Sequence, residues 1–329
     1  ILAIEGVDIV LGAEYKGLLY AEVSKLESKG KSQGFSCERN KIESIFPAFS
    51  TGERTRSFLK VQDGCDYFCA YCTVPIARGK SRNLPIELLV AEAEKIAASG
   101  IKEIVLTGVN TGDFGKTTGE SFLDLLKALN GVHGIERYRI SSIEPNLLTE
   151  EIVEWIASGT KFLPHFHIPL QSGCDQILLR MKRRYNTRMF ADKIALIRKN
   201  MENVFFGIDV IVGFPGETDE LFMETYHFLE EIKPAFIHIF PYSIRPNTPA
   251  ASMPDQVDSQ QKDKRVKMLE ELSDRLHSEF CNHNKGREEE VLFESTVKGG
   301  MMFGYTRNYI KVEAPYDREK IGKIVKVVI

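Results

Sequence analysis

The sequence has 329 residues, of which 43% are hydrophobic and 27% are charged, and its formal net charge is −3. This composition is typical of a globular protein with a real core, and it excludes both a disordered chain and a basic field over the whole surface. No run of about eighteen apolar residues predicts a membrane span. The six cysteines are too sparse for a disulfide framework. They indicate a reducing compartment, so we expect a cytoplasmic protein.

The first fifty residues are interpreted as the end of a larger unit. The chain does not begin with Met, and residues 1–17 predict a last helical turn, a Gly-Val-Asp turn and a short strand. A linker rich in Lys, Ser and Gly follows. We therefore expect residues 1–50 to be the remnant of a preceding domain plus a linker, and the chain to be a fragment or processed form of a longer protein.

Short apolar runs alternate with amphipathic helical stretches between residues 57 and 242. The runs are apolar on both faces, as in a parallel sheet covered by helices. One helical stretch begins at a capping Thr149, and another, from 175 to 201, is broken near residues 185–187. Six strands are predicted, in SFLKVQDG (57–64), KEIVLTG (102–108), RYRISSIEP (137–145), HFHIPLQSG (165–173), FFGIDVIVGFPGE (205–217) and AFIHIFPYS (235–243).

An open doubly wound sheet and a partial β/α barrel both fit this α/β pattern. Glycine and polar residues gather just after the strands, where barrel sites are built. This favours a partial (β/α)6 barrel over residues 51–286, closed by a long charged helix from residue 258. From residue 287 to 329, apolar and polar residues alternate, and we expect a small all-β module with a five-stranded barrel.

Three of the six cysteines lie within eight residues, in the stretch GCDYFCAYC: Cys65, Cys69 and Cys72. Core packing is one alternative, because positions i, i+4 and i+7 share a helix face, but Gly64 and Asp66 indicate a loop. A structural zinc ion needs four ligands, and the candidate fourth, Cys37, lies far away in the linker. A thioredoxin-like Cys-x2-Cys pair has no use for the first cysteine.

The remaining alternative is an iron–sulfur cluster held by three thiolates. Four iron atoms need four outer ligands. Three cysteines therefore leave one iron with an open coordination position, as catalytic metal sites do. A small molecule with an amine and a carboxylate could chelate the iron at that position.

At these cysteines the sequence resembles the radical S-adenosylmethionine (SAM) superfamily, including an aromatic residue, Tyr71, just before the third Cys. The terminal module resembles the TRAM domain of the methylthiotransferase branch, so the resemblance covers essentially the whole chain. CAYCTVPIARGKSRN and RISSIEP most resemble the enzymes that act on N6-threonylcarbamoyladenosine beside the tRNA anticodon. Further stretches that resemble the branch are PIARG (75–79), LTGVNTGDFG (106–115), HIPLQSG (167–173), MKRRYN (181–186) and IVGFPGET (211–218).

The resemblance implies an enzyme that adds a methylthio group to C2 of N6-threonylcarbamoyladenosine at position 37 of tRNA. The implied cofactors are SAM and a 4Fe-4S cluster that is held by the three cysteines and completed by SAM. One electron would free a 5′-deoxyadenosyl radical, which would abstract hydrogen from C2, and a second SAM would supply the methyl group. The implied partners are the tRNA anticodon stem-loop and an electron donor such as flavodoxin or ferredoxin, with no membrane.

The resemblance also implies roles for residues that follow the strands. Gly108 and Asn110 are expected near the methionine amine of SAM. Arg183 is expected at the methionine carboxylate, since a guanidinium fork suits that contact. Gln171 and Ser172 are expected at the ribose or the sulfur site. The cofactor-binding residues so implied are Tyr71, Gly108, Asn110, Gln171, Ser172, Arg183 and Gly213.

Some of these residues have an alternative explanation. Gly213 and Gly216 are expected to bring the backbone close to the adenine. VGFPGE could instead be a tight strand-to-helix turn with Glu217 in the first helical turn. Arg183 lies in a run of three cations, 182–184, which could be a solvated face.

The roles of two histidines and one glutamate can be interpreted in more than one way. His165 and His167 share one face of a strand, and we expect them to be packed or hydrogen-bonded rather than metal-bound. Glu144 follows the third strand and is either a substrate-facing residue or the start of a helix.

Cations and aromatic residues are interleaved in the terminal module, which fits RNA backbone contact and base stacking. Acidic residues dilute this charge, so an ordinary mixed surface is the alternative. Arg307 and Lys311 are the RNA contacts we name here, with Arg78 beside the cysteine stretch. The full set in the module is Lys298, Arg307, Tyr309, Lys311, Lys320, Lys323 and Lys326.

Members of the resembled branch bind a second 4Fe-4S cluster through three cysteines of the preceding domain, and this sequence begins after them. Cys37, Cys174 and Cys281 are scattered and do not replace that set. We expect the second cluster only in a full-length protein, and this chain to cleave SAM but to be impaired in sulfur insertion. The alternatives are methylthiolation of isopentenyladenosine or of a ribosomal protein, and an iron–sulfur tRNA-binding fragment without thiolation activity.

Overall fold

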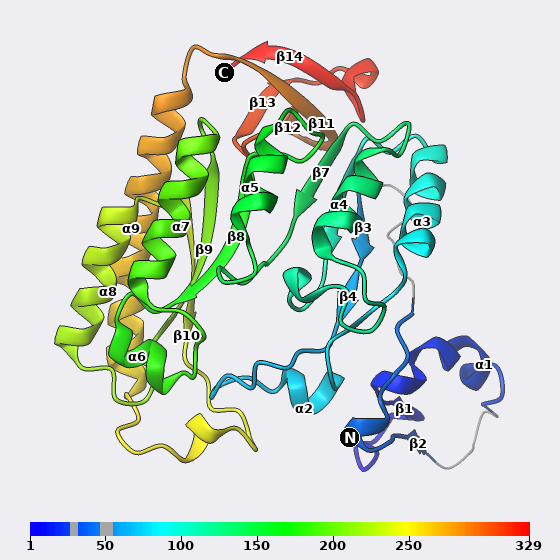
Figure 1. Cartoon of the computed structure of the whole chain (residues 1–329), viewed down its shortest axis with the longest axis vertical. Coiled ribbons are helices and arrows are strands. Elements are labelled where there is room, and N and C mark those ends of the chain that lie inside the picture. Colours follow the sequence, from blue (N-terminus) through cyan, green and yellow to red (C-terminus); the bar gives the residue numbers. More distant parts are fainter. Residues whose placement is uncertain (27–31, 47–54) are drawn as a thin grey trace.

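The central sheet is built from parallel strands that alternate with helices (Figure 1). The computed structural model describes residues 1–26, 32–46 and 55–329. All six predicted strands are present in this part of the chain. They are β3 (Arg56–Lys60), β6 (Glu103–Thr107), β7 (Arg137–Ile140), β8 (His165–Gln171), β9 (Phe205–Val212) and β10 (Phe236–Pro241).

These strands follow one another around the sheet in chain order. β3, β6 and β7 pair in one parallel set, and β8, β9 and β10 pair in another. Bridges from Tyr138 to Phe162 and from Ser142 to His167 join the two sets. Right-handed connections in this order place every connecting helix on one face, and Figure 1 shows the helices outside the strands. The predicted partial (β/α)6 barrel is confirmed, because a doubly wound sheet would reverse its strand order.

The helices begin and end where local sequence signals place them. The predicted break near residues 185–187 is confirmed as the gap between α6 and α7. Thr149 caps α5 by accepting a hydrogen bond from the Ile152 backbone N–H at 3.3 Å. The helices around the barrel are α3 (Ile86–Ala98), α4 (Phe122–Asn130), α5 (Glu150–Ala157), α6 (Asp175–Arg180), α7 (Thr187–Asn200), α8 (Asp219–Ile232) and α9 (Ser259–Asn284).

The terminal module is an antiparallel sheet in the order β13-β12-β11-β14. We expected a barrel of five strands here, but the described residues form a sheet of four strands. Residues 316–323 form turns around the short 3-10 helix η5 (Arg318–Lys320) rather than a strand. The strands are β11 (Glu288–Lys298), β12 (Met301–Thr306), β13 (Lys311–Pro315) and β14 (Ile324–Val328).

The module docks on the amino-terminal ends of the barrel strands through buried charges. The Glu103 carboxylate accepts a hydrogen bond from Arg139 Nε at 2.7 Å, and both side chains are almost fully buried. Arg139 also donates to the Thr306 carbonyl at 2.9 Å, and Arg137 donates to the Glu290 carbonyl at 2.8 Å. Because a buried charge is stable only with partners, this network fixes the module against the barrel.

The amino-terminal segment packs beside the opposite end of the barrel (Figure 1). Its strand β1 (Ile9–Leu11) pairs in parallel with β2 (Gln33–Phe35). The expected short strand is confirmed, but residues 1–6 form turns and not the end of a helix. The proposed domain boundary at residue 50 lies outside the described residues. The short helices here are η1 (Ala13–Leu18), α1 (Leu19–Val23) and η2 (Arg39–Lys41).

No helix in the described part of the chain is long and apolar enough to cross a membrane.

Candidate active site

The three neighbouring cysteines lie on a loop between β4 (Gln62–Asp63) and α2 (Val74–Arg78). The alternative of a shared helix face is therefore wrong. Gly64 begins the loop at φ +72, and a Cβ atom there would lie 1.9 Å from the Lys80 carbonyl oxygen. Phe68 also has a positive φ, of 52. The loop is thus held in a turned conformation, in which Cys69 is buried and Cys65 and Cys72 are half-buried.

The donor set fits a multi-atom cluster better than a single metal ion. A tetrahedral zinc ion with Zn–S bonds of about 2.3 Å needs its sulfur atoms about 3.8 Å apart. Within the described residues, the only group of potential ligand atoms that all lie within 4.8 Å contains no cysteine. Cys37, the candidate fourth zinc ligand, therefore does not complete such a set. Burial raises the pKa of Cys65 to about 11, so a metal group must displace the thiol proton.

Gln62 connects the cysteine loop to the loop after β6. Its buried side-chain amide donates to the Gly64 carbonyl at 2.7 Å, and its Oε1 atom accepts from the Val109 and Asn110 backbone N–H groups at 2.9 Å each. The sequence analysis missed this residue. No local pattern marks it, because the same predicted strand also carries the polar residues Ser57, Lys60 and Asp63.

Gly108 and Asn110 lie beside this connection. A Cβ atom on Gly108 would lie 3.0 Å from Gln62 Oε1, so a side chain there would crowd the Gln62 amide. Asn110 is 3% exposed, and neither its Oδ1 nor its Nδ2 atom finds a hydrogen-bond partner in the described structure. A buried amide without partners is costly. This side chain therefore fits the binding of a polar group that the protein does not itself supply.

Arg183 reaches the cysteine loop from the turn after α6. Its Nη1 atom donates to Cys69 Sγ at 3.0 Å and to the Tyr71 hydroxyl at 3.3 Å. Its Nη2 atom pairs with the Glu144 carboxylate. The Arg183 side chain is 2% exposed, so the solvated-face alternative is wrong for it. Glu144 likewise belongs to the site, where it compensates the buried guanidinium.

Two tyrosines, the buried Tyr185 and the half-buried Tyr71, hold this arginine in place. The Tyr185 hydroxyl accepts from Arg183 Nε at 3.1 Å and donates to the Leu170 carbonyl at 2.8 Å. Tyr71 packs edge-on against Phe214, with ring centroids 6.5 Å apart. Burial raises the pKa of Tyr71 well above its usual value, so the ring stays neutral. The guanidinium is therefore fixed from several sides before any ligand binds.

The remaining predicted cofactor-binding residues are Gln171, Ser172 and Gly213. They lie at or just after the ends of strands, where each takes part in the local structure of the protein. Gln171 has a φ of 68 at an irregularity in the β8–β9 pairing. The Ser172 hydroxyl bonds the Thr225 hydroxyl at 3.1 Å, toward α8. The Gly213 N–H donates to Glu217 at 2.7 Å. Glu217 precedes the helix cap, so it is not in the first helical turn as the alternative had it.

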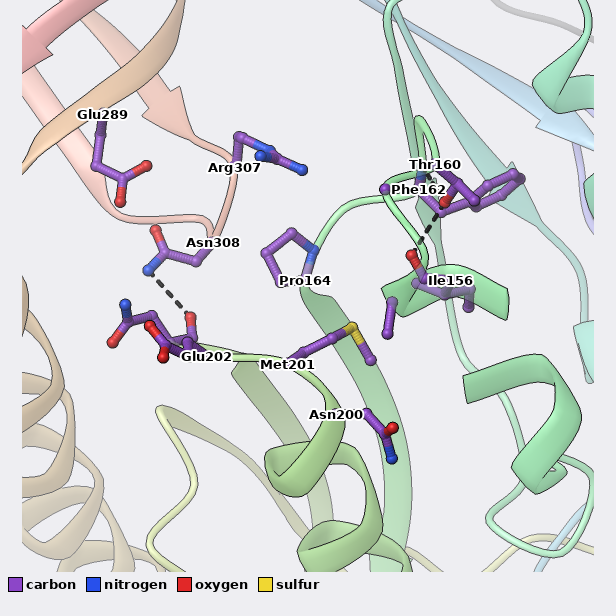
Figure 2. Close-up of a pocket in the computed structure, with 13 residues that line it drawn as sticks. Ile156, Thr160, Phe162, Pro164, Asn200, Met201, Glu202, Glu289, Arg307 and Asn308 are labelled. Atoms are coloured by element: carbon purple, nitrogen blue, oxygen red, sulfur yellow. Dashed lines mark hydrogen bonds between the residues drawn. The ribbon is translucent and has the colours of Figure 1, made fainter. Parts of the chain in front are cut away.

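The predicted RNA contacts do not gather around the cysteines. Arg78 lies on α2 beside the loop, where it donates to Asp63 at 3.1 Å. Arg307 and Lys311 lie on the terminal module, at the other end of the barrel (Figure 1). Figure 2 shows Arg307 on the turn after β12, across a cavity from Met201.

We expected Tyr309 of the module to be available for base stacking, but its ring is already packed within the protein. Tyr309 packs against His165, with ring centroids 4.8 Å apart, and the Arg139 guanidinium lies 4.7 Å from its ring centroid. It also stacks on Tyr305 at 4.7 Å. Its ring therefore serves the joint between module and barrel, while Arg307 and Lys311 remain exposed.

Comparison with known proteins places this geometry in a family. A family model described as the radical SAM superfamily matches residues 59–229. The threonylcarbamoyladenosine tRNA methylthiotransferase MtaB of Bacillus subtilis is 42% identical over 337 residues, which cover 99% of this chain and 74% of that protein. The tRNA-2-methylthio-N6-dimethylallyladenosine synthase of Clostridium botulinum is 37% identical over 276 residues, which cover 83% of this chain and 61% of that protein.

A solved structure shares the fold. Coproporphyrinogen III oxidase (HemN) from Escherichia coli, a radical SAM enzyme, aligns with a TM-score of 0.51 at 16% identity, over 68% of this chain and 53% of that chain. At this identity the likeness shows the barrel fold alone.

Proposed function

This chain belongs to the radical SAM superfamily and to its methylthiotransferase branch, and from that membership we propose that it adds a methylthio group to C2 of N6-threonylcarbamoyladenosine at position 37 of tRNA. The observation that carries the proposal is the 42% identity to the threonylcarbamoyladenosine enzyme over 99% of the chain. The match to the dimethylallyladenosine enzyme is lower, 37%, and covers 83% of the chain.

The cysteine loop is the proposed cofactor site. Cys65, Cys69 and Cys72 would hold three irons of a 4Fe-4S cluster, and SAM would complete the fourth. When bound, this pair supplies a 5′-deoxyadenosyl radical, which is the difficult chemistry that a protein leaves to its cofactor. The placement of all three cysteines on one loop supports this assignment, as does their absence from the groups of ligand atoms that lie within 4.8 Å of one another in the described residues.

The chain's own residues bind and orient the cofactor. The unpartnered amide of Asn110 is available to hold the polar methionine end of SAM. Arg183 supplies a fixed cation for the methionine carboxylate, because Tyr185 and Glu144 already restrain its guanidinium. Tyr71 packs its ring against Phe214 and shares Arg183 Nη1 with Cys69, so it would keep water from that side of a bound cofactor.

Isopentenyl-type adenosine is the second candidate substrate, supported by the 37% identity to the dimethylallyladenosine enzyme. The deciding experiment is nucleoside mass spectrometry of tRNA from a strain that lacks the gene for this chain, with and without its restoration. We expect loss of 2-methylthio-N6-threonylcarbamoyladenosine and its return on complementation. Loss of the 2-methylthio group from an isopentenyl adenosine instead would refute the substrate, and unchanged tRNA would refute tRNA as the target.

A further inference from the structure

Three neighbouring strands bring two histidines and an aspartate together inside the barrel. His167 lies on β8, Asp209 on β9 and His238 on β10. Asp209 is paired directly with His238, and His167 with Gly207, two residues before Asp209. Side chains two residues apart on a strand share a face. The His238 ring faces Gly207 on the neighbouring strand, because a Cβ atom at Gly207 would lie in van der Waals contact with His238 Nε2, at 3.5 Å.

The three side chains have the spacing of a metal site. One ligand atom from each lies within 4.8 Å of the others, and no other such group of His, Cys, Asp or Glu occurs in residues 1–26, 32–46 and 55–329. His167 Nε2 is 2.6 Å from Asp209 Oδ1, and the ring centroids of His167 and His238 are 4.9 Å apart. Ligand atoms around a tetrahedral zinc ion lie about 3.3 Å apart. Only small side-chain rotations would therefore be needed.

The site opens into a cavity. His167, His238 and Gly207 line a space of about 510 Å³ between the barrel and the terminal module. The His167 side chain is 29% exposed and that of Asp209 is 16% exposed. Three protein ligands with free space beside them leave coordination positions for water or a ligand, as in catalytic zinc sites.

Two of the three Arg and Lys side chains that line the cavity are compensated by carboxylates. Glu103 binds Arg139 and Glu294 binds Arg56. The third, Lys311, is exposed, with its ammonium 4.2 Å from the centroid of the Phe303 ring. Asp209 forms an ion pair with His167 alone among the described residues.

We propose that His167, Asp209 and His238 bind one first-row divalent transition-metal ion such as Zn²⁺. Two imidazoles and a carboxylate suit such ions, whereas Mg²⁺ prefers oxygen ligands in an octahedral arrangement. The site is separate from the cysteine loop, which follows the carboxyl end of β3, while these three residues lie within their strands. In the structure His167 is hydrogen-bonded to Asp209, as expected, and the proposal adds a metal ion to this pair.

The first test is a calorimetric titration of the anaerobically reconstituted, cluster-loaded chain with Zn²⁺, and with Mg²⁺ in parallel. Iron content is measured before and after, to show that zinc has not replaced the cluster. We expect one Zn²⁺ per chain and no detectable Mg²⁺ binding. Absence of Zn²⁺ binding, or equal binding of both ions, overturns the proposal.

The second test assigns the ligands with His167→Asn, His238→Asn and a matched control, His227→Ala. His227 is an exposed histidine that pairs with Glu230 on α8, so its loss should leave zinc affinity unchanged. Loss of an outer-shell partner already costs about 10- to 100-fold in affinity, so we expect each ligand variant to bind Zn²⁺ more than about 100-fold more weakly. Unchanged affinity in both ligand variants overturns the site.

A spectroscopic test does not depend on those variants folding. A chain with Cys65, Cys69 and Cys72 all changed to Ala holds no coloured cluster, so bound Co²⁺ can be read from its visible absorption. We expect visible bands without the intense near-ultraviolet absorption of a cobalt–thiolate bond. Strong thiolate absorption would assign the metal to Cys37, Cys174 or Cys281 and would contradict the proposal.

Discussion

Arg183 donates a hydrogen bond to Cys69 Sγ at 3.0 Å, while the same guanidinium pairs with the Glu144 carboxylate. The cation thus joins a predicted cluster ligand to a carboxylate on the neighbouring barrel loop. Its side chain is 2% exposed and that of Glu144 is 13% exposed. Arg183 is therefore a structural link that also places a fixed positive charge beside Cys69.

Replacing Arg183 with Met should weaken SAM binding by about 10- to 100-fold, because a hydrogen bond to a charged group is worth about 1.5–3 kcal/mol. The measurement is SAM affinity of the cluster-loaded chain by equilibrium dialysis. Lys182→Gln is the matched control, since this neighbour is exposed. Equal losses in the two variants would show that the effect is only one of net charge.

The same substitution should destabilise the fold, because it leaves the Glu144 carboxylate buried without its cation. Breaking a buried pair costs about 3–5 kcal/mol. The double variant Arg183→Met, Glu144→Gln should recover most of that loss in urea unfolding. If the double variant is no more stable than the single one, the two side chains are not energetically coupled.

Replacing Gln62 with Ala should reduce the iron and sulfide bound per chain after reconstitution. The change leaves two backbone N–H groups, of Val109 and Asn110, without their acceptor and frees the start of the cysteine loop. Each unsatisfied buried group costs about 1–3 kcal/mol. Gln256→Ala is the control, because this exposed amide only bonds the Ala250 and Met253 carbonyls. Normal iron and sulfide content in the Gln62 variant would contradict the inference that Gln62 holds the cysteine loop in place.

Replacing Glu103 with Gln should lower the free energy of unfolding by about 3–5 kcal/mol, because Arg137 and Arg139 lose their buried counter-charge. Glu136→Gln is the comparison, since Glu136 pairs with Lys102 at the surface and should matter by about 0–1 kcal/mol. Urea unfolding followed by circular dichroism measures both. Similar values for the two variants would mean that the buried network does not fix the module to the barrel.

Replacing Arg307 and Lys311 with Ala should weaken tRNA binding and make it less dependent on salt. Each lost phosphate contact reduces the slope of log affinity against log salt by about 1. Filter binding at several salt concentrations measures the slope, with the double variant Arg188→Ala, Lys199→Ala on α7 as a charge-matched control, since both side chains are exposed. An unchanged slope in the double variant would show that this face of the module does not contact RNA.

Much of the barrel could be predicted because its signals are local. Apolar runs gave all six strands, and Thr149 and the break near residues 185–187 marked helix ends. The terminal module was harder. Its residues alternate as strands do, but residues 316–323 close into turns, and Tyr309 packs into the joint with the barrel. Alternation shows which residues share a face, but not which neighbour will cover that face.

The chemistry of the site was only partly visible in the sequence. The spacing of the three cysteines is a local signal, and it led to the loop. Gln62 and the burial of Arg183 depend on contacts between distant segments, so no local pattern shows them. The same holds for His238, which meets His167 only because β8, β9 and β10 are neighbours.

The most direct test of the central claim, that the cysteine loop holds a cluster that cleaves SAM, is an assay for 5′-deoxyadenosine. The reconstituted chain is incubated anaerobically with SAM and dithionite, and the product is measured by mass spectrometry. We predict 5′-deoxyadenosine from the unaltered chain and from Cys37→Ser, and none from Cys65→Ala, Cys69→Ala or Cys72→Ala. No product from the unaltered chain, or undiminished product from those three variants, would contradict the account.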